Sequence, residues 1–166
     1  MKKVMAYLIV SVSIISNVQF LSAEAKNVDR MIAKCKACIQ ACTACITNCV
    51  RAQNACSNPP VYTSTKTVYD QCVEICKSCI EQCNVCISTC EVCIDNPHDN
   101  EAMQACIMAC VTCSQICGSC KSNSAICQSL CKLDKYKEGM DACRACVSAC
   151  TKCSEACKSC LIGCLQ

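Results

Sequence analysis

Residues 72–93 read CVEICKSCIEQCNVCISTCEVC, and this stretch decides the fold of the chain. Cysteine recurs in it at alternating steps of four and three residues, from Cys72 to Cys93, without a break. A repeat that averages 3.5 residues keeps these side chains on one stripe of an α-helix, at the a and d positions of a heptad. Soluble helices normally place Leu, Ile or Val at these core positions. The stretch therefore predicts a helix whose buried face consists of thiols.

The same spacing recurs in three further segments, and the four segments together hold all 27 cysteines. Two positions inside the runs carry other small residues, Ala52 and Ser124. The cysteines are Cys35, Cys38, Cys42, Cys45, Cys49 and Cys56 in the first segment, Cys72, Cys76, Cys79, Cys83, Cys86, Cys90 and Cys93 in the second, Cys106, Cys110, Cys113, Cys117, Cys120, Cys127 and Cys131 in the third, and Cys143, Cys146, Cys150, Cys153, Cys157, Cys160 and Cys164 in the fourth. Each segment predicts roughly 30 Å of helix at 1.5 Å per residue.

Helix-breaking and capping residues separate these segments. Ser57–Pro60 ends the first helix and begins a linker, and residues 133–139 join the third helix to the fourth, with Asp134 as a cap. Asn96 is predicted to be the N-cap of the third helix and Pro97 its first residue. Because such links make consecutive helices antiparallel neighbours, we expect an all-α fold: an antiparallel up-down-up-down four-helix bundle with a thiol-lined core.

A second apolar set flanks the thiol stripe at heptad position e and is expected to keep water from the core. Val85 and Val92 lie on a different face of the second helix, which a monomer would expose, so this face is a candidate for self-association. The set at position e consists of Ile39, Ile46, Val73, Ile80, Ile87, Ile94, Ile107, Val147 and Leu161.

Residues 1–25 have the features of a cleaved secretory signal peptide. Lys2-Lys3 form a basic start, Val4–Ile15 is an apolar stretch, and Ala23-Glu24-Ala25 is a small-x-small cleavage site. A membrane anchor is the alternative, but interrupting polar residues leave the apolar part short for a membrane span. The basic start lacks an Arg-Arg pair, which favours the general export route over the twin-arginine route. We therefore expect residues 26–166 to form the bundle in the periplasm or outside the cell, without a membrane anchor.

Disulfides are the first explanation to consider for so many cysteines in an exported chain. Residues three or four apart on a helix have Cβ atoms about 5–6 Å apart, whereas a disulfide needs about 3.8 Å, so pairing within a helix would distort it. Pairing between helices stays open, although 27 is an odd number and disulfide frameworks are usually irregular in spacing. A role for cysteine as a small core residue alone does not account for 27 of them.

Metal binding agrees better with the spacing. Two metal–sulfur bonds of about 2.3 Å each reach from one thiolate to the next, along a helix or across to a facing one. Zinc sites are discrete and tetrahedral, and iron–sulfur proteins use compact loop motifs that this sequence lacks. Cu(I) is soft and binds thiolates, and at one ion per thiolate it leaves the core neutral, whereas zinc at that loading would bury a large positive charge. The sequence thus favours multiple Cu(I) ions.

The two ends of the predicted bundle differ in their side chains. Met31, Met103 and His98, the only histidine of the sequence, fall at one end. Thioether and imidazole groups bind Cu(I), so these three residues are predicted to form a metal-uptake site. End-of-core packing for the methionines and a solvated loop for the histidine are the alternatives. The other end is predicted to be closed by Tyr62, Tyr69 and Tyr136.

The CxxxCxxCxxxC runs on four predicted helices resemble the copper storage protein family, the cysteine-rich four-helix-bundle copper-binding proteins of bacteria. The resemblance covers residues 26–166. It implies that many Cu(I) ions are bound inside the bundle by thiolates and are loaded through one end, where His98, Met31 and Met103 are the matching residues. It also implies storage or sequestration rather than catalysis, often with self-assembly to a tetramer. A copper-donor or acceptor protein is a further candidate partner.

Other functions have little support in the residues. One histidine and no paired carboxylates on the thiol stripe argue against an enzyme, and a thiol–disulfide exchange enzyme would carry one or two CxxC sites instead. The 16 basic and 13 acidic residues form no run of either sign, so nucleic acid is not an expected partner. We predict an exported protein that stores or sequesters Cu(I). A disulfide-crosslinked structural or redox-buffering protein, and a binder of zinc or another soft metal, are the alternatives.

Overall fold

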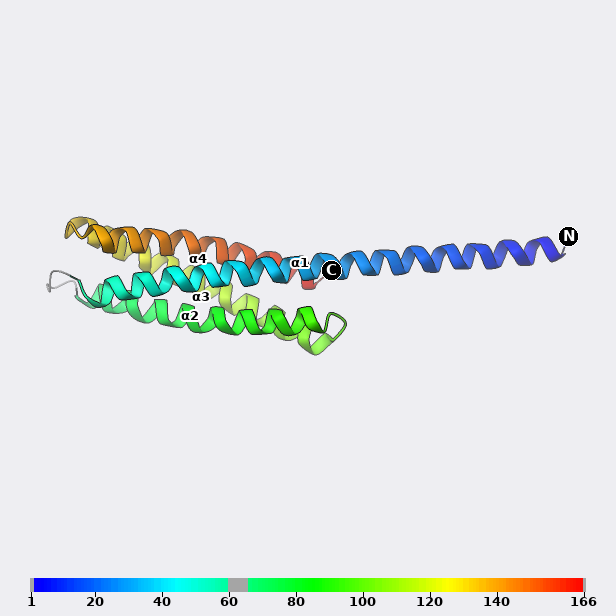
Figure 1. The fold of residues 1–166 in the computed structure, drawn as a ribbon, viewed down its shortest axis with the longest axis horizontal. Helices are drawn as coiled ribbons and strands as arrows, with labels where there is room; N and C mark the ends of the chain where they lie inside the picture. The colour runs from blue at the N-terminus through cyan, green and yellow to red at the C-terminus, as the bar shows by residue number, and fades with distance from the viewer. Residues whose placement is uncertain (1, 60–65, 166) are drawn as a thin grey trace.

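The computed structural model is a bundle of four α-helices (Figure 1). The helices are α1 (Lys2–Ser57), α2 (Lys66–Asp95), α3 (Asn100–Leu133) and α4 (Lys137–Cys164). The structure describes residues 2–59 and 66–165, with side chains from Glu24 onward. This part of the chain contains helices and no strand, which confirms the predicted all-α class. Tyr62 and the side chains of the predicted signal peptide before Glu24 lie outside the described residues.

The helices form a ring in which α1 and α3 each pack against both α2 and α4. Contacts between α1 and α4 give the direction of the chain: Cys35 faces Cys160, and Cys49 faces Cys146. Residue numbers rise along one helix as they fall along the other, so α1 and α4 are antiparallel. Three more helix pairs are antiparallel by the same criterion: α1 with α2, α2 with α3, and α3 with α4. The chain therefore runs up, down, up and down, as Figure 1 also shows.

The core is the thiol stripe that the heptad spacing predicts. Every cysteine of the chain is buried, because the 3.5-residue repeat turns each run toward the bundle axis along its whole length. Most of the apolar residues at position e are partly buried against this core, as expected. Val85 and Val92 are 49% and 51% exposed, which agrees with their predicted position on an outer face of α2.

The link between α2 and α3 differs from the prediction. Asn96 and Pro97 do not open α3, because Asn96 instead ends α2 by donating its backbone N–H to the carbonyl of Val92 at 3.0 Å. The N-cap of α3 is Asp99, whose carboxylate accepts a hydrogen bond from the backbone N–H of Glu101 at 2.9 Å. A carboxylate at this position also interacts favourably with the helix dipole, so Asp99 is the better cap.

The link between α3 and α4 consists of residues 134–136 and is shorter than predicted. Asp134 is the C-cap of α3, and α4 begins directly after Tyr136, whose side chain makes no cap hydrogen bond. Lys135 has a φ of 55°, and its N–H donates to the carbonyl of Lys132, while that of Tyr136 donates to the carbonyl of Cys131. These two bonds form a Schellman motif with a lysine where glycine is usual.

Within the described residues, α3 is the one helix long and apolar enough to span a membrane by length and composition. Its buried residues are mostly the cysteines of the core. Core helices of soluble proteins have the same length and composition, so α3 is accounted for by its place in the bundle.

Candidate metal centre

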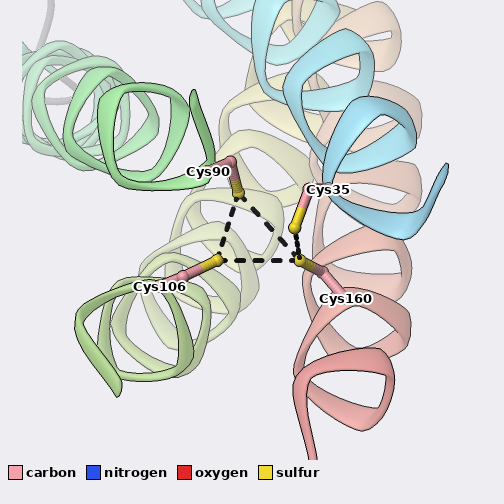
Figure 2. Close-up of side chains that lie close together, drawn as sticks. All are labelled: Cys35, Cys90, Cys106 and Cys160. Atoms are coloured by element: carbon pink, nitrogen blue, oxygen red, sulfur yellow. Dashed lines mark hydrogen bonds between the residues drawn. The ribbon is translucent and has the colours of Figure 1, made fainter. Parts of the chain in front are cut away.

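The cysteines form layers along the bundle axis, and each layer takes one thiol from every helix. Figure 2 shows one layer, in which Cys35 of α1, Cys90 of α2, Cys106 of α3 and Cys160 of α4 point toward one another. The Sγ–Sγ distances are 3.5 Å for Cys35–Cys160 and for Cys90–Cys106, and 3.9 Å for Cys106–Cys160. All four sulfur atoms lie within 4.8 Å of one another. Such a group can hold a metal ion.

Four more layers of this kind follow along the axis. Their members are Cys38, Cys86, Cys110 and Cys157; Cys42, Cys83, Cys113 and Cys153; Cys45, Cys79, Cys117 and Cys150; and Cys49, Cys76, Cys120 and Cys146. Sulfur contacts within these layers measure 3.5–4.0 Å. A heptad step of 3.5 residues spaces successive layers about 5 Å apart. The five layers hold 20 of the 27 cysteines.

Successive layers also contact one another. Cys45 and Cys49, one helical turn apart on α1, have their sulfur atoms 3.9 Å apart, and Cys146 and Cys150 on α4 are 3.8 Å apart. Groups that combine thiols of two layers also have all four sulfurs within 4.8 Å of one another. The layers are therefore a continuous column of thiols rather than a row of separate sites.

The remaining seven cysteines lie beyond the two ends of this column. Cys93 and Cys164 lie at one end, next to the first layer. The other end holds the remaining five: Cys56, Cys72, Cys127, Cys131 and Cys143. All of the predicted cysteine ligands thus reach the core, and the structure divides them into a column and two end groups.

Burial raises the pKa of the thiols, whereas hydrogen bonds between them raise the pKa of some cysteines and lower that of others, such as Cys38 and Cys45. Hydrogen bonds from neighbouring thiols, and then burial, raise the pKa of Cys49, Cys83 and Cys90 far above its ordinary value. Burial raises the pKa of Cys93 to about 12. Ser124 is the one polar residue buried among the described side chains, and no charged group is buried with the thiols. A cation that enters the column must therefore displace protons, because nothing else there balances charge.

The structure contains the cysteines as free thiols. The shortest sulfur–sulfur distance is 3.2 Å, between Cys56 and Cys127, well beyond the roughly 2.05 Å of a disulfide bond. Thiols at 3.2–4.0 Å are in hydrogen-bond contact, which is a packing that leaves room for a bridging metal. The described residues therefore contain no disulfide bond of the kind that the disulfide alternative requires.

The three predicted uptake residues lie at the same end of the bundle but do not form one group. Met31 is 4% exposed, and its Sδ accepts a hydrogen bond from Cys93 Sγ at 4.0 Å. Met103 is partly buried against the core. His98 is exposed in the α2–α3 link and lies in a shallow hollow beside residues 24–29 of α1. The structure thus brings Met31 to the thiols and leaves His98 at the surface.

The opposite end is closed by tyrosines, as the sequence predicts for Tyr69 and Tyr136. Tyr69 is 1% exposed, and its hydroxyl donates to the carboxylate of Asp134 at 2.9 Å. The Tyr136 hydroxyl donates to the carbonyl of Ala55 at 3.3 Å. The Tyr136 ring packs directly on Gly139, where a Cβ would clash with it. Burial raises the pKa of both tyrosines, so their hydroxyls stay protonated donors.

Two features of this site were not predicted from the sequence. The hydroxyl of Ser124 donates to Cys146 Sγ at 3.3 Å and so binds the last full layer. The Tyr69–Asp134 hydrogen bond joins α2 to the end of α3. The sequence did signal the first, since Ala52 and Ser124 interrupt the first and third runs at matching places. It contained no signal for the second.

Comparison with protein-family models, with curated proteins and with solved structures finds no match to this chain. The function must therefore be inferred from the geometry of the thiol column itself.

Proposed function

We propose that the protein is an exported store for Cu(I), which binds many ions through cysteine thiolates inside the four-helix bundle. The observation that supports this most directly is the column of five four-thiol layers, with sulfur atoms 3.5–4.0 Å apart and no charged residue among them. A site for one structural or catalytic metal needs about four ligands. A column of 20 equivalent thiols can bind many ions at once, which is what storage or sequestration requires.

Charge favours Cu(I) over zinc. Each Cu(I) displaces one thiol proton, so a column filled at one ion per thiolate stays neutral. Zinc held by four thiolates in each layer would leave two negative charges per layer, with layers about 5 Å apart. No buried lysine, arginine or histidine among the described residues compensates for such charge, and uncompensated buried charge is very costly. Cu(I) is also softer and accepts low coordination numbers.

The proposal extends to the route of the metal. Met31 and the thiol of Cys93 lie in contact at the end of the column that has no tyrosine plug, and we assign metal uptake to this end, with His98 and Met103 as further ligands. The resemblance to copper storage proteins supports this direction. Export rests on the signal-peptide features of residues 1–25. Self-association would use the face of Val85 and Val92, which is exposed in this single chain.

The decisive experiment is an anaerobic titration of the reduced protein with Cu(I) in competition with a chromogenic Cu(I) chelator. Uptake of about 13 to 27 ions is expected, since low-coordinate soft-metal binding gives one ion per one to two thiolates. A parallel titration with zinc should end at far fewer ions. A thiol count on the isolated protein, before reduction, measures how many cysteines are paired.

Binding of only a few Cu(I) ions would refute storage. If most thiols were also paired in the isolated protein, the disulfide-crosslinked alternative would replace it. If zinc filled the protein as fully and as tightly as Cu(I), the assignment of copper would be wrong while metal binding by the thiol column would stand.

A further inference from the structure

The column of thiols is interrupted at one level near the tyrosine end. Continuing the register of the α1–α4 contacts places Ala52 opposite Cys143, and that of the α2–α3 contacts places Ser124 opposite Cys72. Ala52 and Ser124 are therefore at the same height, on the two diagonally opposed helices α1 and α3, and both are fully buried. A methyl and a hydroxyl replace two of four thiols at this level, and neither is a ligand for soft Cu(I).

Cys56, Cys127 and Cys131 lie beyond the interrupted level, and together with the two thiols of that level, Cys72 and Cys143, they form a group of five. Cys56 Sγ is 3.2 Å from Cys127 Sγ and 3.8 Å from Cys143 Sγ. Cys72 and Cys131 lie next to Cys127 and Cys143. The group thus takes thiols from all four helices, as a layer does, and it is compact enough for shared thiolates to bridge several ions.

The passage between this group and the column is narrow. On α1 the thiols on either side of the gap, Cys49 and Cys56, are seven residues apart, or about 10 Å along the axis, twice the usual step. The contact that the structure shows across the gap runs along α2, from Cys72 to Cys76. The Ser124 hydroxyl occupies part of this level and is bound to the last layer. Three sulfur contacts join the Cys45 layer to the Cys49 layer (Cys45–Cys49, Cys49–Cys150 and Cys146–Cys150), so an ion that crosses the gap has fewer thiols to move between than an ion inside the column.

The far side of the group is closed. Tyr69 is fully buried over it and is held by its hydrogen bond to Asp134. The Tyr136 ring packs against the first turn of α4, and its hydroxyl donates a hydrogen bond to the carbonyl of Ala55 on α1. A Cβ on Gly139 would clash with the Tyr136 ring and would lie 2.8 Å from Cys131 Sγ. The ring, the glycine and the Cys131 thiol are therefore closely packed. The group has the gap on one side and an aromatic lid on the other.

We propose that Cys56, Cys72, Cys127, Cys131 and Cys143 form a second Cu(I) compartment, which exchanges metal with the main column slowly because Ala52 and Ser124 replace two of the four thiols where the compartment meets the column. This inference rests on the proposed storage of Cu(I) and adds a division of the store. Most of the copper is released promptly from the column, and a smaller part is retained at the closed end.

The test is the time course of copper removal from the fully loaded protein by an excess of a chromogenic Cu(I) chelator under anaerobic conditions. We expect a fast phase and a slow phase, with about a fifth of the ions in the slow one, since the compartment holds five of the 27 thiols. Removing the compartment with Cys56→Ser, Cys127→Ser and Cys131→Ser should abolish the slow phase. The control, Cys164→Ser, removes a thiol at the opposite end of the column and should lower the capacity and leave the slow phase unchanged.

A gain-of-thiol variant keeps the test independent of any damage from lost cysteines. Ala52→Cys with Ser124→Cys completes the interrupted layer and should raise the rate of the slow phase about threefold, toward that of the fast phase, because thiols on α1 and α3 add two paths to the one along α2. Single-phase release from the unaltered protein, or a slow phase that persists in the thiol-loss variant and is no faster in the thiol-gain variant, would overturn the inference. Neither result would refute the proposed storage of Cu(I), which is refuted only if the protein does not bind many Cu(I) ions.

Discussion

Substituting Gly139 and Gly118, two of the three glycines, by alanine should change the stability in opposite directions. Gly139 is buried in the first turn of α4, where a Cβ would be 2.8 Å from Cys131 Sγ and closer still to the Tyr136 ring. Gly118 is exposed in the middle of α3, where a Cβ would meet nothing within 4 Å. The pair therefore applies the same chemical change to a crowded position and to an open one.

The magnitudes follow from these surroundings. At Gly118 the change removes the conformational cost of glycine in a helix interior, a gain of about 0.5–1 kcal/mol. At Gly139 the same gain is smaller, because the residue lies in the first turn, and overpacking costs about 1–3 kcal/mol. Tyr136 cannot simply swing away, since its hydroxyl is bonded to Ala55 and its backbone ends α3. We expect a net loss of about 1–2 kcal/mol.

The assay is thermal unfolding of the reduced, metal-free protein, followed by far-ultraviolet circular dichroism. For a protein of this size, 1 kcal/mol shifts the Tm by about 2–4 °C. Gly139→Ala should therefore melt roughly 2–8 °C lower, and Gly118→Ala roughly 1–4 °C higher, than the unaltered protein. If Gly139→Ala melted at or above the unaltered protein, the tight packing of Tyr136 at the closed end would be refuted.

Four further predictions concern the ends of the bundle. Tyr69→Phe removes the hydrogen bond to Asp134 and should cost about 1–2 kcal/mol in denaturant unfolding; an unchanged midpoint would show that the bond contributes nothing. Lys135→Gly relieves the left-handed backbone at φ 55° and should raise the unfolding free energy by about 0.5–1 kcal/mol. Burial raises the pKa of Cys93 from 9.0 to about 12, so the folded protein keeps a proton that the unfolded chain loses. The stability of the metal-free protein should accordingly fall between pH 9 and pH 12, as urea titrations at stepped pH would show. Met31→Leu should cost less than about 1.5 kcal/mol in stability but slow the initial uptake of Cu(I); an unaltered uptake rate would reduce Met31 to a packing residue.

The sequence predicted the helices and their buried face because both depend on a local period. The step pattern from Cys72 to Cys93 allows only one face of a helix to contain all the thiols. Helix ends were predicted less well, as Asn96 and Asp99 show. Both residues have good capping side chains. Asn96 is still bonded to α2 through its backbone N–H and the carbonyl of Val92, so Asp99 is left to cap α3.

The grouping of cysteines into layers could not be read from the sequence, because it depends on the register between helices. That register is set where the links end and where large side chains fit, and one of the links was predicted several residues too long. Cys49 has Cys146 and Cys120 as neighbours only in the observed register. The same register places Ala52 level with Ser124, so two interruptions that the sequence shows in separate runs fall at one level of the column.

A core made of thiols stabilises the bundle less than an aliphatic core would. Each buried CH₂ contributes about 0.8 kcal/mol, and cysteine offers one such group where leucine offers the equivalent of four. The partly buried isoleucines beside the stripe, such as Ile39 and Ile80, restore part of this difference. The remaining part of this stability is gained only when metal binds, because a ligand that binds only the folded chain stabilises it by mass action. Copper removal should therefore lower the Tm of the loaded protein ion by ion, and the smallest losses should accompany the first ions released. In the proposed Cu(I) store, content and stability would be coupled, and the metal-free form is expected to unfold at a lower temperature than the loaded form.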